Sequence, residues 1–240
     1  MGKSVAEPVI VFQPDGIEIP ARITSLARFR RWALSESFPE RGRIDWVAGR
    51  LEVDMSPEDL FTHGTPKSAI AAKLGMLLQE TEKGLVFVDK TRISCPEADL
   101  SAEPDVLVVL DETLASGRVR LIPKASGEEG RFVEIEGAVD IVVECVSDSS
   151  VAKDTDLRDD YQRARVREYW IVDARGEKVA LQILHYRRDG YVEAVEDRSG
   201  FVASEVLKAR VRLLRRRKKS GAVYFRLEVR KMPGRKAPGR

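Results

Sequence analysis

The stretch AEPDVLVVL, residues 102–110, decides the fold together with DIVVECVSDSS, residues 140–150. Each stretch contains a nearly continuous apolar run, Val106–Leu110 in the first and Ile141–Val146 in the second. Such runs are typical of strands that are buried on both faces and therefore lie in the middle of a sheet. We expect these two strands to form the centre of the domain.

Amphipathic segments surround this centre. Helical spacing predicts helices over 24–34, from Thr62 or His63 to about 82, and from about 153 to 165. Alternation predicts a hairpin over Arg43–Val47 and Arg50–Asp54, a protruding hairpin over 119–122 and 132–135, and strands over 85–89, 169–172 and 179–185. Because strand-only connections outnumber crossovers, this order predicts an α/β domain with a mixed β-sheet flanked by helices.

Composition excludes several classes of protein. The 240 residues are 43% hydrophobic and 33% charged, which is ordinary for a globular chain with a charged surface. No apolar run reaches the roughly 18 residues that a membrane span needs, and the first residues do not resemble a secretory signal. Cys95 and Cys145 provide neither a disulfide framework nor a zinc site, which favours a cytoplasmic location.

Charge divides the chain into an acidic body and a basic C-terminal end. From Lys208 onward there are fourteen Lys or Arg and one acid, a net +13, so that the rest of the +2 chain carries −11. We therefore predict an N-terminal extension over 1–23, a domain over 24–206 and a basic tail over 207–240. The tail is either a solvated segment or an arm that contacts phosphate, although Val223–Val229 alternates well enough to be an edge strand. The candidate nucleic-acid-binding residues of the arm are Arg215, Arg216, Arg217, Lys218 and Lys219.

Two acids lie in the central strands. Asp105 follows Pro104 at the mouth of the first strand, and Glu144 lies inside the second. A carboxylate in an apolar strand has to be paired, protonated or bound to a metal, because burying it bare is very costly. If the strands are neighbours, the two oxygen donors suit Mg²⁺ or Mn²⁺. The alternative is that Asp105 caps a turn and Glu144 forms a structural ion pair.

Three segments carry a resemblance to a known family: AEPDVLVVL (102–110), DIVVECVSDSS (140–150) and YQRARVREYWIVDARG (161–176). Together they resemble the Uma-type family of putative restriction endonucleases, which is assigned to the PD-(D/E)XK nuclease superfamily. The stretch LEVDMSPEDLFTHG (51–64) is similar to that family as well, so the resemblance extends from about residue 28 to 185. It implies a restriction-endonuclease-like fold, dependence on a divalent metal and hydrolysis of phosphodiester bonds in nucleic acid.

The resemblance also identifies a departure. The superfamily commonly has a lysine two residues beyond the catalytic Glu, and this chain has Val146 there. The Uma-type family places its lysine on the following helix, where this sequence has Lys153 and Arg158 as the nearest matches. We take Lys153 as the first candidate for the cation and Arg158 as the second, because Arg is a poor proton shuttle. The alternative is that both belong to a solvated helix face.

Other residues support or complete this site. His63 opens a helix in the family-like stretch and is a candidate metal ligand, or simply a polar residue at a helix start. Asp45 is either a third metal ligand or, slightly favoured, a partner of Arg43 or Arg50 on an exposed strand. We expect Cys145 to point away from Glu144, because side chains alternate along a strand. Trp170 is expected in the core.

Two functions of different classes remain open on the sequence alone. The first is a metal-dependent endonuclease acting on nucleic acid, with DNA as the expected substrate and a homodimer as a possible assembly. The second is a nucleic-acid-binding or assembly protein that keeps the fold without cutting. Val146 and Arg158 favour the second, whereas the two costly acids Asp105 and Glu144 favour the first.

Overall fold

A central mixed sheet is built around the two apolar strands. The computed structural model describes residues 8–12, 16–147 and 151–232, and the side chains of 151–156 lie outside this description. The helices and helical turns are α1 (Leu26–Ala33), η1 (Leu60–Gly64), α2 (Thr65–Thr81), η2 (Pro96–Ala98), α3 (Asp111–Ala115) and α4 (Val151–Arg163). The central sheet has the strand order β14 (Gly190–Glu193), β13 (Ala180–Arg187), β12 (Glu168–Asp173), β11 (Ile141–Cys145), β8 (Val106–Leu110) and β5 (Gly84–Val88).

The order of these strands confirms the predicted fold class. Strands β8 and β11 are antiparallel neighbours in the middle of the sheet, and β11 pairs in parallel with β12 through the crossover helix α4. The remaining neighbours are antiparallel, so the sheet is mixed. Both apolar strands are buried along their whole length, as their continuous apolar sequence predicts.

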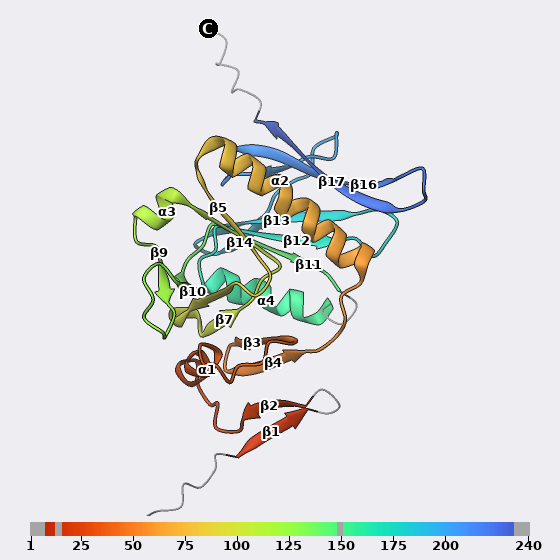
Figure 1. Ribbon diagram of the computed structural model, residues 1–240. Coiled ribbons are helices and arrows are strands. Elements are labelled where there is room, and N and C mark those ends of the chain that lie inside the picture. The colour runs from red at the N-terminus through yellow and green to blue at the C-terminus, as the bar shows by residue number, and fades with distance from the viewer. Residues whose placement is uncertain (1–7, 13–15, 148–150, 233–240) are drawn as a thin grey trace, which may run out of the picture.

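Side chains alternate between two layers on the faces of this sheet. Leu107 and Tyr169 belong to a core shared with α4 and the second sheet, whereas Trp170 and Cys145 belong to a core shared with α2. Figure 1 shows α2 above the central sheet and α4 below it. The predictions that Trp170 lies in the core and that Cys145 points away from Glu144 are therefore confirmed.

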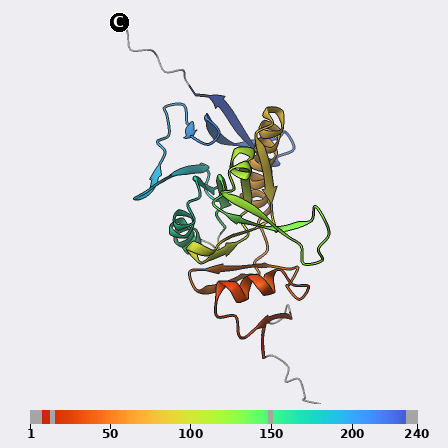
Figure 2. The same ribbon diagram turned by 90° about the vertical axis from the view of Figure 1, so that its left-hand side faces the viewer.

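A second sheet lies on the α4 side. Its order is β4 (Arg50–Asp54), β3 (Arg43–Val47), β7 (Leu100–Ala102), β6 (Arg92–Cys95), β10 (Phe132–Gly137) and β9 (Val119–Pro123). The predicted hairpin of β3 and β4 has the expected bounds, and β9 and β10 form the predicted protruding hairpin, which extends to the right in Figure 2. The chain passes between the two sheets after β4, β5, β7, β8 and β10. Asp105 lies at one of these crossings, between β7 and β8.

The N-terminal segment is part of the same unit rather than a separate extension. Strands β1 (Val9–Phe12) and β2 (Ile17–Pro20) form a hairpin, visible below α1 in Figures 1 and 2. Ile17 and Ile19 of β2 are buried in one cluster with Phe29 of α1 and Trp46 of β3. The predicted boundary at residue 23 therefore cuts through a continuous core.

The C-terminal segment is likewise folded, and the predicted free tail is wrong for residues up to 231. Strands β15 (Val202–Ser204), β16 (Ala209–Arg217) and β17 (Val223–Lys231) form an antiparallel sheet. Val211, Leu213, Phe225 and Leu227 are buried in the core that contains α2. Arg210, Arg212, Arg226 and Arg230 alternate with these apolar residues and lie on the other face, so a high positive charge is compatible with a packed strand. The stretch Val223–Val229, whose alternation left an edge strand possible, lies within β17.

Within the described parts of the chain, none of the helices combines the length and the apolar character needed to cross a bilayer.

Candidate metal centre

The crossing between the two sheets opens into a cavity of about 330 Å³. It is lined by residues from the β3–β4 hairpin, the η1 segment and the ends of β5, β7, β8 and β11: Gly42, Arg43, Asp54, Ser56, Pro57, Glu58, His63, Asp89, Lys90, Glu103, Asp105, Glu144, Cys145 and Ser147. Six of these residues are acids and only two are Lys or Arg. The lining is therefore acidic, which suits a cation.

Asp105 and Glu144 lie side by side at this cavity. The register of β8 and β11 pairs Val106 with Val143, which brings the preceding Asp105 opposite the following Glu144 on the same face of the sheet. Both residues are buried, at 6% and 1% exposure. The prediction that the two acids lie on adjacent strands of one sheet is confirmed, whereas their role as metal ligands stays a prediction.

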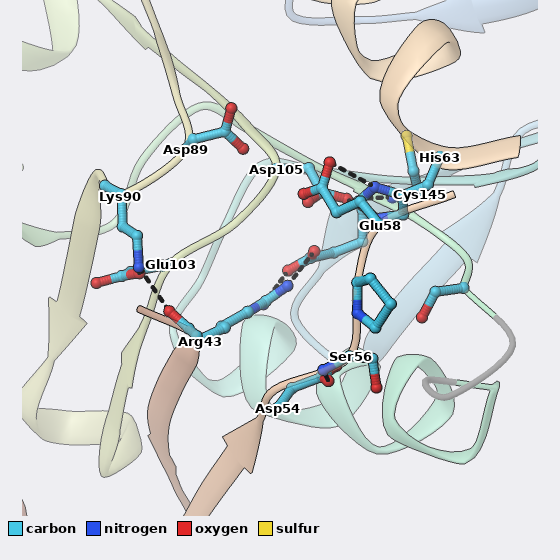
Figure 3. Close-up of a pocket in the computed structure, with 14 residues that line it drawn as sticks. Arg43, Asp54, Ser56, Glu58, His63, Asp89, Lys90, Glu103, Asp105 and Cys145 are labelled. Atoms are coloured by element: carbon cyan, nitrogen blue, oxygen red, sulfur yellow. Dashed lines mark hydrogen bonds and ion pairs between the residues drawn. The ribbon is translucent and has the colours of Figure 1, made fainter. Parts of the chain in front are cut away.

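His63 is held against Asp105 by the local chain. Asp59 accepts hydrogen bonds from the backbone N–H groups of Phe61 and Thr62, which caps η1 and directs His63 inward. The Nε2 atom of His63 lies 3.2 Å from Oδ2 of Asp105, which also accepts the N–H of Cys145 at 2.7 Å. Figure 3 shows both contacts converging on the carboxylate.

Glu58 completes a group of three candidate ligands. Donor atoms of Glu58, His63 and Asp105 all lie within 4.8 Å of one another. Two ligands of one ion at about 2.0–2.6 Å are at most about 5 Å apart, so the spacing fits. Nδ1 of His63 is buried and has no hydrogen-bond partner among the described residues, although Glu58 lies 3.5 Å away. This orphaned atom and the two carboxylates fit a divalent cation.

The charges of this group depend on one another. Burial works against the charge on Asp105, but His63, Arg43 and the N–H of Cys145 outweigh it and lower the pKa of the carboxyl. Burial also opposes a charge on His63, yet its hydrogen bond to Asp105 raises the pKa of the imidazole above its usual value. His63 and Asp105 therefore each favour the charged form of the other.

Glu144 has a different set of partners. Its carboxylate accepts a fork from Arg43, with Nη1 at 3.1 Å and Nη2 at 2.9 Å, and the hydroxyl of Tyr161 at 2.7 Å. Burial raises the pKa of Glu144, with Asp105 adding to the effect and Arg43 opposing it. Nη2 of Arg43 and the Tyr161 hydroxyl occupy both lone pairs of Oε1, and Nη1 of Arg43 occupies one lone pair of Oε2. One lone pair of Oε2 is left for a further ligand.

Asp45 lies behind this arginine. Its Oδ2 accepts Nε of Arg43 at 2.7 Å, and its Oδ1 accepts the backbone N–H of Glu103 at 3.0 Å. The favoured interpretation as a partner of Arg43 is confirmed, but the exposed strand expected for it is wrong. Asp45 is fully buried because it lies on the same face of β3 as Val47, which packs into the core shared with α4, whereas Ile44 and Trp46 on the other face pack against α1.

The cations expected on α4 have different outcomes. The side chain of Lys153 lies outside the described residues, so its direction stays a prediction. Arg158 is exposed and lines a separate groove with Arg188 and Tyr191, so the prediction that it points at the acids is wrong. It lies one helical position past the buried Leu157 and therefore faces away from the sheet. Val146 is buried at 5% exposure.

Four contributing residues were not identified from the sequence. They are Arg43, Glu58, Lys67 and Tyr161. Lys67 lies one turn beyond His63 on α2 and is 6% exposed, with its amine 2.6 Å from Glu58 and 2.8 Å from Asp89. Glu58 and Lys67 could have been identified from the sequence, because Glu58 lies shortly before His63 and Lys67 lies one helical turn after it. Arg43 and Tyr161 reach Glu144 only through tertiary packing.

The five basic residues 215–219 lie at the β16–β17 turn. Arg215 donates to the backbone oxygens of Ala174 and of Gly176, the latter at 2.7 Å, which fixes the hairpin to the β12–β13 turn. Arg216, Arg217, Lys218 and Lys219 are exposed. Their role in binding nucleic acid stays a prediction.

Comparisons with known proteins identify the family and the fold. The family model described as Uma2, putative restriction endonuclease, matches residues 26–213. A crystal structure of a putative nuclease belonging to DUF820 from Anabaena variabilis has a TM-score of 0.55 at 16% identity, covering 76% of this chain and 90% of that one, and shows the same fold. No curated protein sequence matches the chain. With its central mixed sheet and with the family model covering most of its length, the chain belongs to the Uma2 family of putative restriction endonucleases.

Proposed function

We propose that this protein is a divalent-metal-dependent endonuclease that hydrolyses phosphodiester bonds in DNA. The observation that supports it is the convergence of Glu58, His63 and Asp105 at one cavity, beside Glu144 on the neighbouring strand. Membership of the Uma2 family supports the same conclusion. The carboxylates suit Mg²⁺ and Mn²⁺ alike, and an imidazole ligand favours Mn²⁺ because Mg²⁺ prefers oxygen donors.

Each residue then has a distinct part. A bound ion supplies Lewis acidity toward a phosphate oxygen and a lowered pKa for a coordinated water. Asp105 would hold the ion together with His63 and Glu58, and Glu144 lies opposite Asp105 on the neighbouring strand. Cys145 contributes its backbone N–H, which fixes the Asp105 carboxylate. The buried amine of Lys67 keeps Glu58 in place through an ion pair with its half-exposed carboxylate.

Cleavage of supercoiled plasmid, linear duplex and single-stranded DNA in Mg²⁺ or Mn²⁺ tests this function. We expect nicking or linearisation by the wild-type protein, and its loss in Asp105→Asn and Glu144→Gln. Calorimetry with Mn²⁺ runs beside it, because a non-catalytic binding protein would cleave nothing. Mn²⁺ binding that persists unchanged in Asp105→Asn would argue against the proposed ligand set.

We further propose that the β16–β17 turn holds the phosphate backbone of the substrate. Its exposed residues Arg216–Lys219 carry four positive charges on a body that is acidic elsewhere. Arg215 fixes the turn to the β12–β13 connection, and β12 runs parallel to β11, which carries Glu144. The turn therefore lies near the end of the central sheet at which both β11, the strand of Glu144, and β12 end. A rigid hairpin replaces the flexible arm that the sequence suggested.

Salt dependence of DNA binding separates this role from general charge. Replacing the four residues 216–219 by Gln should weaken binding and lower the salt slope by about 0.9 for each lost phosphate contact. The control replaces four exposed arginines near α1, Arg22, Arg28, Arg31 and Arg41, which changes the net charge equally. Equal effects of the two sets would refute a specific role for the turn.

Light scattering with and without DNA tests the proposed homodimer.

A further inference from the structure

The cavity contains a cation that the sequence motif does not supply. Val146 occupies the position where the superfamily commonly has lysine, Arg158 lines another groove, and the side chain of Lys153 lies outside the described residues. Among the described residues that line the cavity, Arg43 and Lys90 are the two with a lysine or arginine side chain. They come from β3 and from the β5–β6 crossing, which belong to other parts of the fold than the motif strand.

Arg43 has donors left for a ligand. A guanidinium carries five N–H groups. Three are used by Asp45 and Glu144, through Nε, Nη1 and Nη2. The remaining two, one on each Nη, have no hydrogen-bond partner among the described residues. The side chain is 24% exposed, and this exposed part is directed to the cavity that it lines.

Arg43 is also fixed in its orientation. Asp45 holds Nε from behind and is itself held by the N–H of Glu103, so the guanidinium plane cannot rotate without breaking a buried ion pair. Glu144 in turn is fixed by Tyr161. A donor that is oriented before the substrate arrives costs no reorganisation when charge develops.

We propose that Arg43 is the cation of this nuclease site, which positions Glu144 and presents its two remaining N–H groups to the scissile phosphate. This inference rests on the proposed function, because it names the residue that takes the place of the missing lysine. Planar guanidinium groups match phosphate oxygens well. Arg43 neutralises charge and orients groups, and as a guanidinium it is a poor proton shuttle and does not transfer the proton to the leaving oxygen.

Two other cations fit this role less well. Lys67 is bound between Glu58 and Asp89 and does not line the cavity. Lys90 lies at the rim, 54% exposed, and its amine donates to the backbone oxygen of Gly42 at 2.5 Å. Neither contacts Glu144 or Asp105 within ion-pair distance in the described contacts. Arg43 alone of the three touches a proposed catalytic acid.

The matched control is Arg30, which also bridges two carboxylates. Its Nε lies 2.8 Å from Glu134 and its Nη2 2.5 Å from Glu136, with 19% exposure, and it lies outside the cavity. Arg43→Ala and Arg30→Ala therefore remove comparable ion pairs. We expect both to lower the thermal midpoint, but only Arg43→Ala to lower DNA turnover, by about 100-fold or more, as for other preorganised donors.

Two readouts besides turnover test the assignment. Mn²⁺ affinity by calorimetry should be equal or higher in Arg43→Ala, because Glu144 loses a competing cation. Millimolar guanidinium should restore part of the turnover in Arg43→Ala and none in Arg30→Ala. Turnover of Arg43→Ala equal to that of Arg30→Ala would overturn the proposal, and so would loss of Mn²⁺ binding.

Other variants decide the remaining cases. If Arg43→Ala does not fold, Arg43→Lys and Arg30→Lys are compared, and equal turnover again overturns the proposal.

If the wild-type protein cleaves no nucleic acid, the proposed function fails, and calorimetry with inorganic phosphate in Mg²⁺ decides the inference. Phosphate should then bind at least about tenfold more weakly to Arg43→Ala than to Arg30→Ala, a difference of about 1.4 kcal/mol. Equal phosphate affinity would overturn it.

Discussion

Replacing Tyr161 by Phe tests whether Glu144 is charged in the metal-free protein. The ring of Tyr161 is fully buried, and the change removes only the hydroxyl that donates to Oε1 of Glu144 at 2.7 Å. A hydrogen bond to a charged group contributes about 1.5–3 kcal/mol to stability. For a chain of this size, that loss lowers the thermal midpoint by about 3–12 °C. Urea and thermal unfolding at pH 7 without metal measure both quantities.

Tyr191→Phe is the matched control. Tyr191 is also buried, but its hydroxyl donates to the neutral backbone oxygen of Val166 at 2.9 Å. We expect a smaller loss there, about 0.5–1.5 kcal/mol. In a Glu144→Gln background, Tyr161→Phe should cost no more than the control, because the charge is gone. Equal losses for the two tyrosines in the wild-type background would refute a charged Glu144.

Three further outcomes are expected. Mn²⁺ at 100 times its dissociation constant should raise the unfolding free energy by about 2.7 kcal/mol. Asp105→Asn should abolish the thermal shift, and a shift that persists would contradict ligation by Asp105. Phe225→Ala should cost about 3–5 kcal/mol because the ring is buried against α2. Tyr224→Ala, at 37% exposure, should cost much less in the same urea titration, and equal losses would place β17 outside the core. Burial raises the pKa of Glu136, but Arg120 and Arg30 outweigh it and hold that pKa below its usual value, so its stabilising contribution is present above about pH 4.5 and is lost as pH falls through the folded value. The difference in urea midpoint between wild type and Glu136→Gln should therefore disappear between pH 6 and pH 3, and a constant difference would contradict this.

Most of the central sheet could be predicted from local sequence. The apolar runs of β8 and β11 showed that they are buried, and the ends of β3 and β4 were marked by Gly49 at a positive φ of 78°. The pairing of the strands was harder to predict from the sequence. Strand β6 follows β5 closely in the chain but belongs to the other sheet, because the chain turns at Asp89 and Lys90 with positive φ values. A non-glycine residue in that conformation gives little signal in a single sequence.

The C-terminal hairpin was misread because its charge was counted without its alternation. In ARVRLLRRR, residues 209–217, Val211 and Leu213 alternate with Arg210 and Arg212. That period of two indicates a strand with one packed face, whatever the charge of the other face. Net charge reports on partners and solubility, not on fold. The same residues can therefore be a packed strand and a basic surface.

The candidate site shows a similar limit at closer range. Asp105 and His63 could be proposed singly, since each stands out in its own segment, and the register of β8 and β11 then brings Asp105 to Glu144. Arg43 could not be proposed from the sequence, because 101 residues separate it from Glu144 in the chain. Burying Glu144 next to Asp105 requires a compensating cation, but nothing requires that cation to come from the same strand. The fold supplies it from β3, with Asp45 as its anchor. A valine at position 146 therefore does not by itself indicate lost activity, because the charge that a motif lysine would bring is already present at the cavity from another strand.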